Sequence, residues 1–515
     1  MHAFLPRLLA LATLTLTALG ADPASIGSPS KPNIVVILAD DLGYGDLPCY
    51  NPTRSKIATP HIDRLAREGM RFTDGHSSSG VCSPSRYTLL TGRYHWRTRL
   101  QTGIVNLWEP PLIAPGRMTI GSLAKLQGYH TAAIGKWHLG WDWPVSPEEK
   151  ATMVGLGGRA GWSKGTLATV PTAAQRAAWS AVFSRPIAGG PTTRGFDHYF
   201  GTDVPNWPPY SFIRDDRTLG VPTDLLKAEQ FAGFQASLQG PALPDWRLDA
   251  VVGGLADRAV AYVEERARAA VPFLLYLPLT TPHTPIAPSV AWRGSSGLND
   301  YADLVMETDA VVGRVLAALE SAGVARHTLV VLTSDNGYES AIGTAPLESK
   351  GHFPSGPLRG YKRDAWEGGH RVPFIVRWPG VVKAETVCDE LVHHADLIAT
   401  FAEIWGARLP ADAGEDSFSL LPVLRGGRGP VRSDAVSCSA DGVQALREGP
   451  WKLICTAKPQ LYNLALDLSE REDLAAQHQD RVHTMLATRE RLIAAGRSTP
   501  GAPQKNDVTV KQSGG

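Results

Sequence analysis

Apolar runs alternate with helical patterns along most of the chain. Residues 33–39, NIVVILA, form a nearly continuous apolar and β-branched run, which predicts a buried strand of a parallel sheet. The next segment, 59–72, places apolar residues at helical spacing and reaches a typical helix stop at Gly69. A strand followed by a helix is typical of an α/β domain.

The same pattern recurs three times. Residues 119–140 read as a helix, a Gly stop and a strand; 248–270 as a helix before a strand at 273–279; and 301–323 as a helix before a strand at 328–334. The four predicted strands end at polar clusters, namely Asp40 with Asp41, Lys136 with His138, His283, and Asp335 with Asn336. Open parallel sheets bind ligands beyond the carboxyl ends of their strands, so these clusters predict one functional site.

Two regions depart from this pattern. Residues 141–190 read as a long loop-like insertion, and connections of that length are usually functional. From about residue 425 the pattern changes to short antiparallel strands and a closing amphipathic helix. The expected division is a main domain over 30–424, a smaller domain with an antiparallel sheet over 425–497, and a flexible tail over 498–515.

The N-terminal residues have the layout of a secretory signal. Arg7 precedes an apolar run from Leu8 to Leu19, and residues 1–20 are therefore predicted to be a signal peptide. No later segment reaches the apolar length of a membrane span. The mature protein is expected to be soluble and exported, either periplasmic or secreted; a form anchored by an uncleaved N-terminus is the alternative.

The charge balance narrows the classes of binding partner, and the cysteine count bears on the disulfides. Residues 1–20 hold one Arg and no acidic residue, so the rest of the chain balances 50 basic against 50 acidic residues. This balance indicates neither a nucleic acid nor a charged membrane surface as a partner. The cysteines, at positions 49, 82, 388, 438 and 455, are too few for a disulfide scaffold. The sequence leaves open whether Cys438 and Cys455 pair.

Four oxygen-bearing side chains follow two of the predicted strands. Asp40 and Asp41 are adjacent carboxylates, and Asp335 and Asn336 follow another strand. Each pair alone is more often a simple turn, but like charges gathered at one sheet edge repel unless a cation or protons intervene, and together the two pairs favour a metal site. Oxygen ligands without Cys or His suit a hard divalent ion, Ca²⁺ first and Mg²⁺ second.

Cations and proton carriers accompany these oxygens. Lys136, His138, His283 and Lys362 lie in Gly- or Pro-rich stretches, and Arg86 closes the cluster CSPSR that begins at Cys82. A single Lys or His is usually a surface or structural residue. Together these residues suit a site that binds a multiply charged oxyanion and protonates a leaving group.

These motifs resemble those of the type I sulfatases of the alkaline phosphatase superfamily over nearly all of residues 32–475. Residues 82–86 match the family's Cys-x-Pro-x-Arg motif, and LLTGR follows. The other matching motifs are ADDLGYGD, GKWHLG, PHTP, SDNG and GYKRDAWEGGHRVPFIVRWPG, in the family's order. The resemblance implies a large, mostly parallel mixed sheet sandwiched by helices, with a smaller C-terminal α+β subdomain that carries an antiparallel sheet.

The resemblance also implies that Cys82 is oxidised to formylglycine by a formylglycine-generating enzyme during export. The hydrated aldehyde is a geminal diol, one hydroxyl of which attacks sulfur to give a covalent sulfate hemiester. Loss of the proton from the other hydroxyl then expels sulfate. Asp40, Asp41, Asp335 and Asn336 would hold Ca²⁺ beside residue 82.

The remaining roles carried over from the family concern the substrate. Arg86 and Lys136 would fix the formylglycine hydroxyls, and His138 would deprotonate one of them. Lys136, Lys362 and His283 would contact the sulfate, and Lys362 and His283 would also protonate the departing alcohol. A further sulfate contact is expected from Thr202, Asp203 or Asn206, of which Asn206 is the chosen candidate. Trp141, Trp143 and Trp162 are candidate sugar-stacking faces in the insertion 141–190, which is expected to wall the pocket. His61, His393 and His394 depart from the family pattern and are interpreted as structural or supporting residues.

The predicted function is hydrolysis of a sulfate ester, with a sulfated saccharide favoured over a small aryl ester. Two alternatives remain at this stage. One is a phosphate or phosphonate monoester hydrolase on the same fold, and the other is a carbohydrate-binding protein that has lost catalysis. Against the second, every motif residue that catalysis requires is present.

Overall fold

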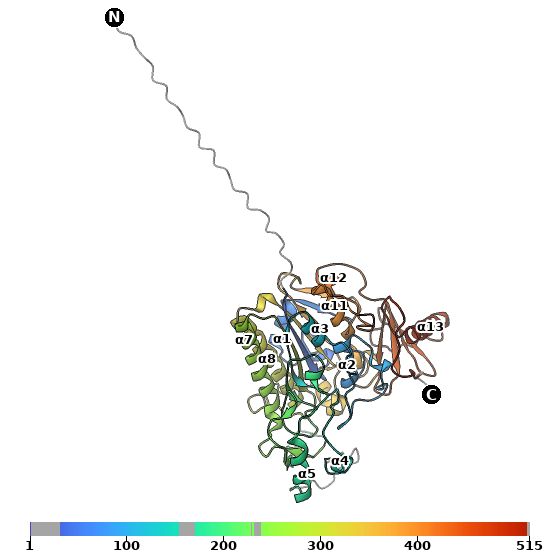
Figure 1. The fold of residues 1–515 in the computed structure, drawn as a ribbon. Coiled ribbons are helices and arrows are strands. Elements are labelled where there is room, and N and C mark those ends of the chain that lie inside the picture. Colours follow the sequence, from blue (N-terminus) through green and yellow to red (C-terminus); the bar gives the residue numbers. More distant parts are fainter. Residues whose placement is uncertain (2–30, 154–169, 228, 231–237, 512–515) are drawn as a thin grey trace. The chain divides into compact units, whose positions relative to one another are not determined.

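The structure, a computed structural model, describes Met1 and residues 31–153, 170–227, 229–230 and 238–511 (Figure 1). The predicted signal peptide and Trp162 lie outside the described residues. The chain divides into two units, Met1–Lys31 and Pro32–Gly515, and all that follows concerns the second. In this described part of the chain, no helix combines the length and apolar character needed to cross a membrane.

A ten-stranded mixed sheet forms the centre of this unit. Its strand order is β13-β2-β12-β11-β1-β10-β4-β5-β6-β7. The bounds are β1 (Asn33–Asp40), β2 (Met70–Phe72), β4 (His130–Lys136), β5 (His198–Thr202), β6 (Ile213–Arg214), β7 (Arg217–Thr218), β10 (Phe273–Pro282), β11 (Thr328–Ser334), β12 (Phe374–Arg377) and β13 (Thr386–Cys388). The four strands predicted from apolar runs are β1, β4, β10 and β11. They are neighbours in the sheet and all parallel, which confirms the predicted fold class.

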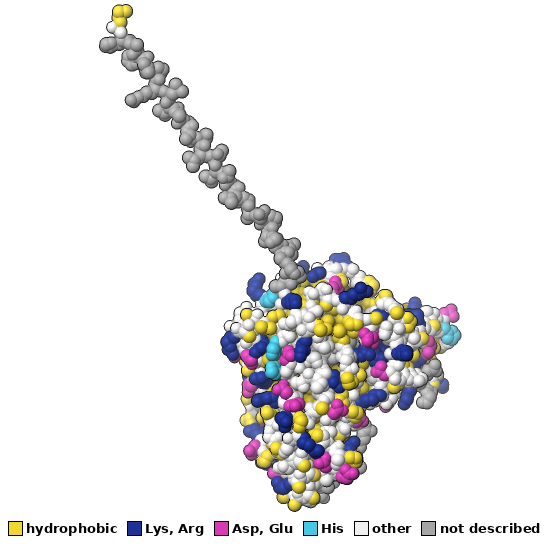
Figure 2. All heavy atoms as spheres, in the orientation of Figure 1, with side chains coloured by type: hydrophobic (Ala, Val, Ile, Leu, Met, Phe, Trp, Pro, Cys, Tyr) yellow, Lys and Arg dark blue, Asp and Glu magenta, His cyan; other side chains and the backbone are white. Residues whose placement is uncertain are grey.

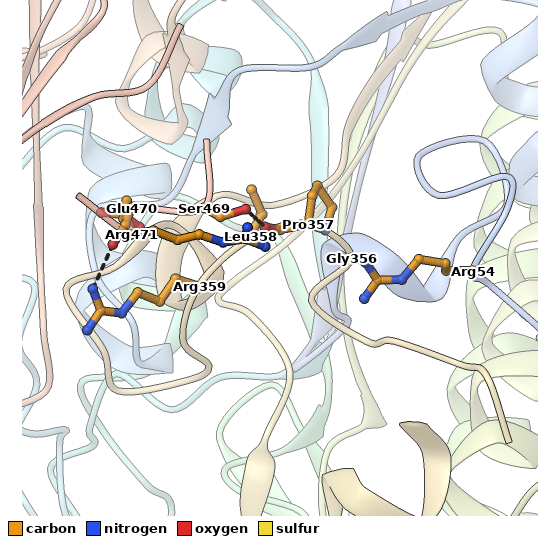
Figure 3. Close-up of a pocket in the computed structure, with 8 residues that line it drawn as sticks. All are labelled: Arg54, Gly356, Pro357, Leu358, Arg359, Ser469, Glu470 and Arg471. Carbon is orange, nitrogen blue, oxygen red and sulfur yellow. Dashed lines mark hydrogen bonds between the residues drawn. The ribbon is translucent and has the colours of Figure 1, made fainter. Parts of the chain in front are cut away.

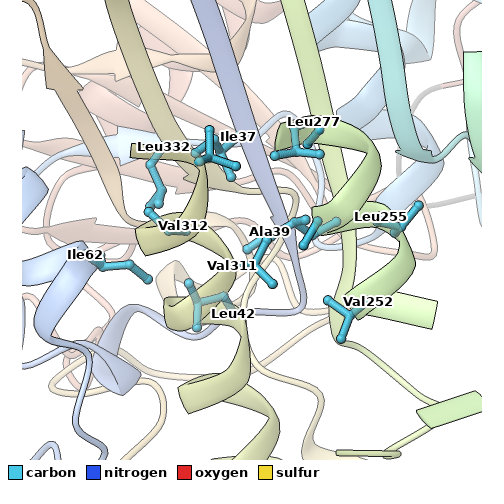
Figure 4. Close-up of a cluster of buried hydrophobic side chains, with 14 of the residues drawn as sticks. Ile37, Ala39, Leu42, Ile62, Val252, Leu255, Leu277, Val311, Val312 and Leu332 are labelled. Carbon is cyan, nitrogen blue, oxygen red and sulfur yellow. The ribbon is translucent and has the colours of Figure 1, made fainter. Parts of the chain in front are cut away.

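Helices cover both faces of this sheet. They are α1 (Pro60–Arg67), α7 (Val251–Ala269) and α8 (Asp300–Ser321) on one face, and α2 (Cys82–Thr91), α3 (Ile120–Leu126) and α11 (Leu397–Ile404) on the other. Side chains of β1 alternate between the two cores, with Ile37 facing α7 and α8 and Leu38 facing the opposite layer. Figure 4 shows Ile37 and Leu277 of the sheet against Leu255 and Val312 of these helices. Burial on both faces explains why these strands have continuous apolar sequences.

Short elements complete the unit. The strands β12, β2 and β13, at one end of the sheet, were not predicted, because runs of three or four residues carry too little pattern. The remaining short elements are β3 (Gly75–His76), β8 (Asp224–Leu225), β9 (Pro241–Ala242), β14 (Val392–His393), α9 (Thr344–Ser349), α10 (Glu367–His370) and α12 (Leu421–Leu424). On the face that Figure 2 shows, Lys and Arg are interspersed with Asp and Glu, in keeping with the balanced charge.

The insertion at 141–190 is not loop-like throughout, contrary to the sequence-based expectation. It contains α4 (Pro147–Met153) and α5 (Ala173–Phe183), whose apolar residues pack together with Trp108. Figure 1 shows both helices beyond the lower edge of the sheet, on the side toward which β1 runs. Their short length and Ala-rich sequence gave only a weak helical period.

The C-terminal region holds the predicted antiparallel sheet. Its strands, β15 (Asp434–Cys438), β16 (Gln444–Glu448), β17 (Trp451–Ile454) and β18 (Gln460–Asn463), pair in sequence order, and α13 (Gln479–Ala495) follows. Tyr94 and Trp96 of the main domain belong to the same hydrophobic core as this sheet. The region is therefore part of the same compact unit as the central sheet and not a separate one.

The expectation of a flexible tail over 498–515 is wrong for residues 498–511. Arg93 is fully buried and donates hydrogen bonds to both carboxylate oxygens of Asp507, at 3.0 and 3.1 Å. Asn506 accepts a hydrogen bond from buried Arg97, and Val510 joins the core under the C-terminal sheet. The tail has too little apolar content to fold alone, but it completes polar and apolar contacts that the rest of the chain presents.

Truncation after Gln504 is expected to destabilise the protein by about 2–4 kcal/mol. It removes the carboxylate that pairs with buried Arg93 and the amide that bonds to Arg97. Thermal unfolding of the purified protein measures the effect. Truncation after Lys511 is the matched control, and equal melting temperatures for the two truncations would contradict the packed tail.

Candidate active site

The ends of four adjacent strands place the predicted residues side by side. In the order of the sheet, β11 leads to Asp335, β1 to Asp40, β10 to His283 and β4 to Lys136. All four strands are parallel, so their carboxyl ends meet at one edge. The helix α2 starts at Cys82 and brings its first turn to the same place.

Three carboxylates converge at this edge. One oxygen each of Asp40, Asp41 and Asp335 lies within 4.8 Å of the others, and all three side chains are buried. Asp41 has a left-handed backbone (φ 66°), and its N–H donates to Asp335 Oδ1 at 3.2 Å. Burial and the charge of Asp40 raise the pKa of Asp335 to about 7. Such crowding requires compensating positive charge.

The donor set fits a hard divalent cation. Asp40 Oδ1 and Asn336 Oδ1 are buried and accept no hydrogen bond from the described residues. Asn336 Nδ2 donates to Asp41 Oδ1 at 2.7 Å, which places the amide group of Asn336 beside the carboxylates. The lone pairs of its Oδ1 are not used in a hydrogen bond with the described residues. Oxygen acceptors without donors, gathered in a buried cluster, are what Ca²⁺ or Mg²⁺ binds.

Three cationic side chains surround the carboxylates. Lys136 Nζ lies 2.7 Å from Asp40 Oδ2, and Lys362 Nζ lies 2.7 and 2.8 Å from the two oxygens of Asp41. Arg86 donates from Nε and Nη2 to Asp335 Oδ2, at 3.0 and 2.7 Å. These groups come from three distant parts of the sequence, and the structure brings them together.

The buried charges set the protonation states. Burial alone would raise the pKa of Asp40, but His283, Lys136 and Arg86 outweigh it and hold that pKa well below its usual range. Burial disfavours the ammonium of Lys362, yet Asp41 outweighs burial and raises its pKa. The centre therefore keeps fixed positive charge at neutral pH, which suits an anionic substrate.

Cys82 is the first residue of α2 and is only 2% exposed. Its Sγ lies within 4.8 Å of ligand atoms of Asp40 and His283. Burial raises the pKa of the thiol in spite of Lys136 and Lys362, so an unmodified Cys82 would be protonated. An unmodified thiol is therefore a poor nucleophile at this position.

Two histidines face the same centre. His283 Nε2 lies 3.8 Å from Asp41 Oδ2, and burial lowers the pKa of His283 to about 4. His138 has a left-handed backbone (φ 52°), and its Nε2 lies 3.1 Å from Val105 O, which makes Nε2 the protonated nitrogen. His138 Nδ1 is buried without a hydrogen-bond partner among the described residues. That nitrogen is free to accept a proton.

The expected sugar-stacking role of Trp141 is wrong in this structure. Trp141 is 1% exposed, and its indole N–H donates to Asp203 Oδ1 at 3.1 Å. Trp143 is partly buried and packs edge-on against Trp108, with ring centroids 4.9 Å apart. The ring of Trp141 is enclosed in the core on the α2, α3 and α11 side of the sheet, and the ring of Trp143 packs against the apolar cluster of the insertion helices. Asn206 is buried near the centre, where Nδ2 lies 3.3 Å from Thr284 Oγ1, next to His283.

The unusual histidines have structural surroundings. His394 Nε2 lies 2.9 Å from Thr333 Oγ1, and His393 Nδ1 accepts from Ala395 N at 3.0 Å. His61 packs against Gly313 of α8, and its backbone N–H donates to Asp309. All three contacts support the structural interpretation.

Asp203 has a role that sequence reasoning missed. It was considered as a sulfate contact, but its Oδ1 accepts from both His138 N and Trp141 Nε1, at 3.2 and 3.1 Å. Burial raises the pKa of Asp203 to about 6. The side chain thus holds the strained backbone of His138 in place. No local sequence pattern signals a contact over 65 residues.

Replacing Asp203 by Ala is expected to lower kcat/KM for p-nitrophenyl sulfate by roughly 10- to 100-fold. His138 N–H and Trp141 N–H would lose their common acceptor, and small displacements of a reacting group cost that much. Asp203→Asn keeps Oδ1 and should retain most activity. Full activity of Asp203→Ala would rule out the positioning role. Equal loss of activity in both variants would mean that the negative charge of Asp203 matters and not its hydrogen bonds.

Comparisons with known proteins agree with this geometry. The sulfatase family model matches residues 32–407. The N-acetylgalactosamine-6-O-sulfatase of Bacteroides thetaiotaomicron is 30% identical, covering 88% of this chain and 92% of that protein. The steryl-sulfatase of Mus musculus is 35% identical, covering 82% of this chain and 70% of that protein.

One solved structure is similar to this chain over most of the length of both proteins. It comes from work on glycosaminoglycan metabolism by Bacteroides thetaiotaomicron and superposes with a TM-score of 0.75 at 27% identity, covering 90% of this chain and 99% of that one. Since the family model spans the central sheet and every residue of the strand-edge cluster, this chain belongs to the sulfatase family and is a sulfuric ester hydrolase.

Proposed function

We propose that this sulfatase removes sulfate from a sulfated carbohydrate, with formylglycine formed from Cys82 and with Ca²⁺ at the carboxylate cluster. The observation that carries the proposal is the buried cluster itself: three carboxylates and an amide oxygen beside Cys82, enclosed by Lys136, Lys362 and Arg86. An oxyanion substrate and a cation between it and the carboxylates would balance these charges.

The relatives support a carbohydrate substrate. The Bacteroides thetaiotaomicron relative, named an N-acetylgalactosamine-6-O-sulfatase, aligns over nearly its whole length. The steryl-sulfatase matches over a smaller share of its own chain. The carbohydrate enzyme is thus the better guide, and N-acetylgalactosamine 6-sulfate is the substrate to test first.

Each group at the site would have a defined task. Formylglycine would supply the attacking hydroxyl, and Ca²⁺ held by Asp40, Asp41, Asp335 and Asn336 would supply fixed positive charge. Lys136 and Lys362 would bind and orient anionic oxygens, because their buried Nζ atoms already contact carboxylates. Arg86 spans Asp335 and the carbonyl of Lys136 and so fixes the relative position of two strands.

The two histidines divide the proton transfers. His138 Nδ1 is the unpartnered buried nitrogen and takes a proton, while Nε2–H stays bound to the Val105 carbonyl. His283 Nε2 lies 3.8 Å from Asp41 Oδ2, and His283 and Lys362 would contact the sulfate and protonate the departing alcohol. Asn206 beside Thr284 is the proposed further contact to the sulfate.

We also propose export, on the basis of the apolar run within residues 1–20, and maturation by a formylglycine-generating enzyme. The mass of the proteolytic peptide that contains Cys82, taken from the native host, tests the modification. An aldehyde-sized mass loss supports it. An unmodified thiol in fully active enzyme overturns it.

The second candidate is a phosphate or phosphonate monoesterase, because a buried cationic site also suits those oxyanions. Rates with p-nitrophenyl sulfate, phosphate and phosphonate, compared at the same leaving group, separate the two. A higher kcat/KM for either phosphorus ester than for the sulfate would replace the proposed reaction.

A further inference from the structure

A second cationic pocket lies apart from the strand-edge centre. It has a volume of about 550 Å³ and is lined by Arg54, residues 356–359 and residues 469–471 (Figure 3). Arg54, Arg359 and Arg471 contribute three guanidinium groups, and we call this site the arginine pocket. Figure 3 shows Arg54 and Arg471 reaching toward the segment Gly356–Leu358 from opposite sides.

The acid that lines this pocket does not neutralise it. The side chain of Glu470 is fully buried, with one oxygen 2.8 Å from Lys452 Nζ and the other accepting from Glu367 N at 2.7 Å. Glu470 has a left-handed backbone (φ 51°), which accompanies this inward placement of the carboxylate. Only its backbone carbonyl faces the arginines, where it accepts from Arg359 Nη1 at 2.7 Å.

Two of the three guanidinium groups are held in place by aromatic rings. The Cζ atom of Arg359 lies 4.0 Å from the ring centroid of Trp366, and the Cζ atom of Arg54 lies 3.6 Å from that of Phe353, so each guanidinium stacks on an aromatic ring. Arg54 Nε is buried and has no hydrogen-bond partner among the described residues. Within the described part of the chain, none of the three arginines forms an ion pair with a carboxylate. Arg54 and Arg359, which are stacked and form no ion pair with the described residues, lose little freedom when they bind a sulfate or a carboxylate.

The chain connects this pocket to the active site. Arg359 precedes Lys362 by three residues, so their Cα atoms are at most about 11 Å apart. Lys362 contacts Asp41 in the centre, while Arg359 contacts the C-terminal region through Glu470. A short segment of the chain therefore joins the arginine pocket to the centre.

We propose that the arginine pocket binds an anionic group, a sulfate ester or a uronate carboxylate, on a second sugar of the saccharide whose sulfate ester lies at Cys82. This inference rests on the proposed carbohydrate function and extends it. The enzyme would then prefer a polyanionic oligosaccharide to a monosaccharide, because only the longer chain reaches the arginines.

The test compares Arg471→Gln and the double variant Arg54→Gln/Arg471→Gln with the wild type. Arg471 is exposed and Arg54 is only half-buried, so both substitutions should fold. Arg326→Gln is the matched control, because Arg326 is exposed and precedes β11, at the opposite edge of the sheet. The substrates are p-nitrophenyl sulfate, N-acetylgalactosamine 6-sulfate, and a uronate-containing tetrasaccharide that bears the same sulfated sugar.

The expected result is a rise in KM for the tetrasaccharide of roughly three- to tenfold per arginine. The salt dependence of this KM should weaken in the double variant, since fewer charges remain to be screened. Both small substrates should be hydrolysed as by the wild type. Equal changes for all three substrates, or no change for the tetrasaccharide, would overturn the proposal.

Calorimetric binding separates this proposal from the proposed function. If the wild type hydrolyses p-nitrophenyl sulfate but neither saccharide, the carbohydrate assignment fails. Calorimetric binding of the tetrasaccharide still tests whether the arginine pocket binds an anionic sugar. Weaker tetrasaccharide binding to the double variant supports the proposed role of the arginine pocket. Binding of inorganic sulfate that depends on the two arginines, with tetrasaccharide binding unaffected, would make it a free-anion site and overturn the proposal.

Discussion

Replacing Cys82 by Ala is expected to lower kcat/KM for p-nitrophenyl sulfate by roughly 10⁴-fold or more. The substitution removes the only atom of this position that can be converted into a nucleophile, while the surrounding cations still bind the substrate. Such a loss should therefore be in kcat and leave KM little changed. Steady-state kinetics on protein produced with a formylglycine-generating enzyme measures it.

The control is Cys388→Ala, which removes a partly exposed thiol from the edge strand β13. Its activity should equal that of the wild type. Cys82→Ala should also unfold at nearly the wild-type temperature, because only one buried sulfur atom is lost. A Cys82→Ala enzyme within tenfold of the wild type would remove position 82 from the reaction.

Removal of divalent cations by EGTA is expected to abolish hydrolysis and to lower the melting temperature. Without a cation, three buried carboxylates face each other and two buried oxygens accept no hydrogen bond from the described residues. Restoring Ca²⁺ at about 100 times its Kd should return about 2.7 kcal/mol of stability. Differential scanning fluorimetry across a Ca²⁺ titration provides a readout that does not depend on activity.

The matched variants are Asp40→Asn and Asp257→Asn. Asp40→Asn removes one negative ligand charge and should weaken Ca²⁺ binding by roughly 100-fold in calorimetry. Asp257 pairs with Arg314 on the surface, so its replacement should leave Ca²⁺ binding unchanged. Metal-free enzyme with full activity would contradict the metal centre, and recovery with Mg²⁺ alone would change the identity of the ion.

The strand-edge cluster could be predicted from the sequence because each central strand has a pattern of its own. A strand buried on both faces must be apolar along its length, so the polar residues that follow it mark its end. Since parallel strands end at one edge, Asp40, Lys136, His283 and Asp335 were expected to meet, and the structure places them there.

The errors concern contacts between distant segments. Trp141 was expected to be a sugar-stacking face, but it is buried in the core on the α2, α3 and α11 side of the sheet, and its indole N–H donates to Asp203. The tail at 498–511 has an unremarkable polar sequence, yet it supplies Asp507 to buried Arg93. A residue's burial depends on what packs against it from elsewhere, and local patterns do not record that.

By itself, the sequence determined the α/β class, the order of the central elements and the chemistry gathered at their ends, because these depend on local periodicity and residue type. The tertiary structure alone decided which side chains hold others in place: Asp203 beneath His138, Glu470 turned toward Lys452, and three arginines left to line one pocket. The physical reason is that hydrogen bonds and ion pairs join residues tens to hundreds of positions apart, and only the folded chain selects those partners.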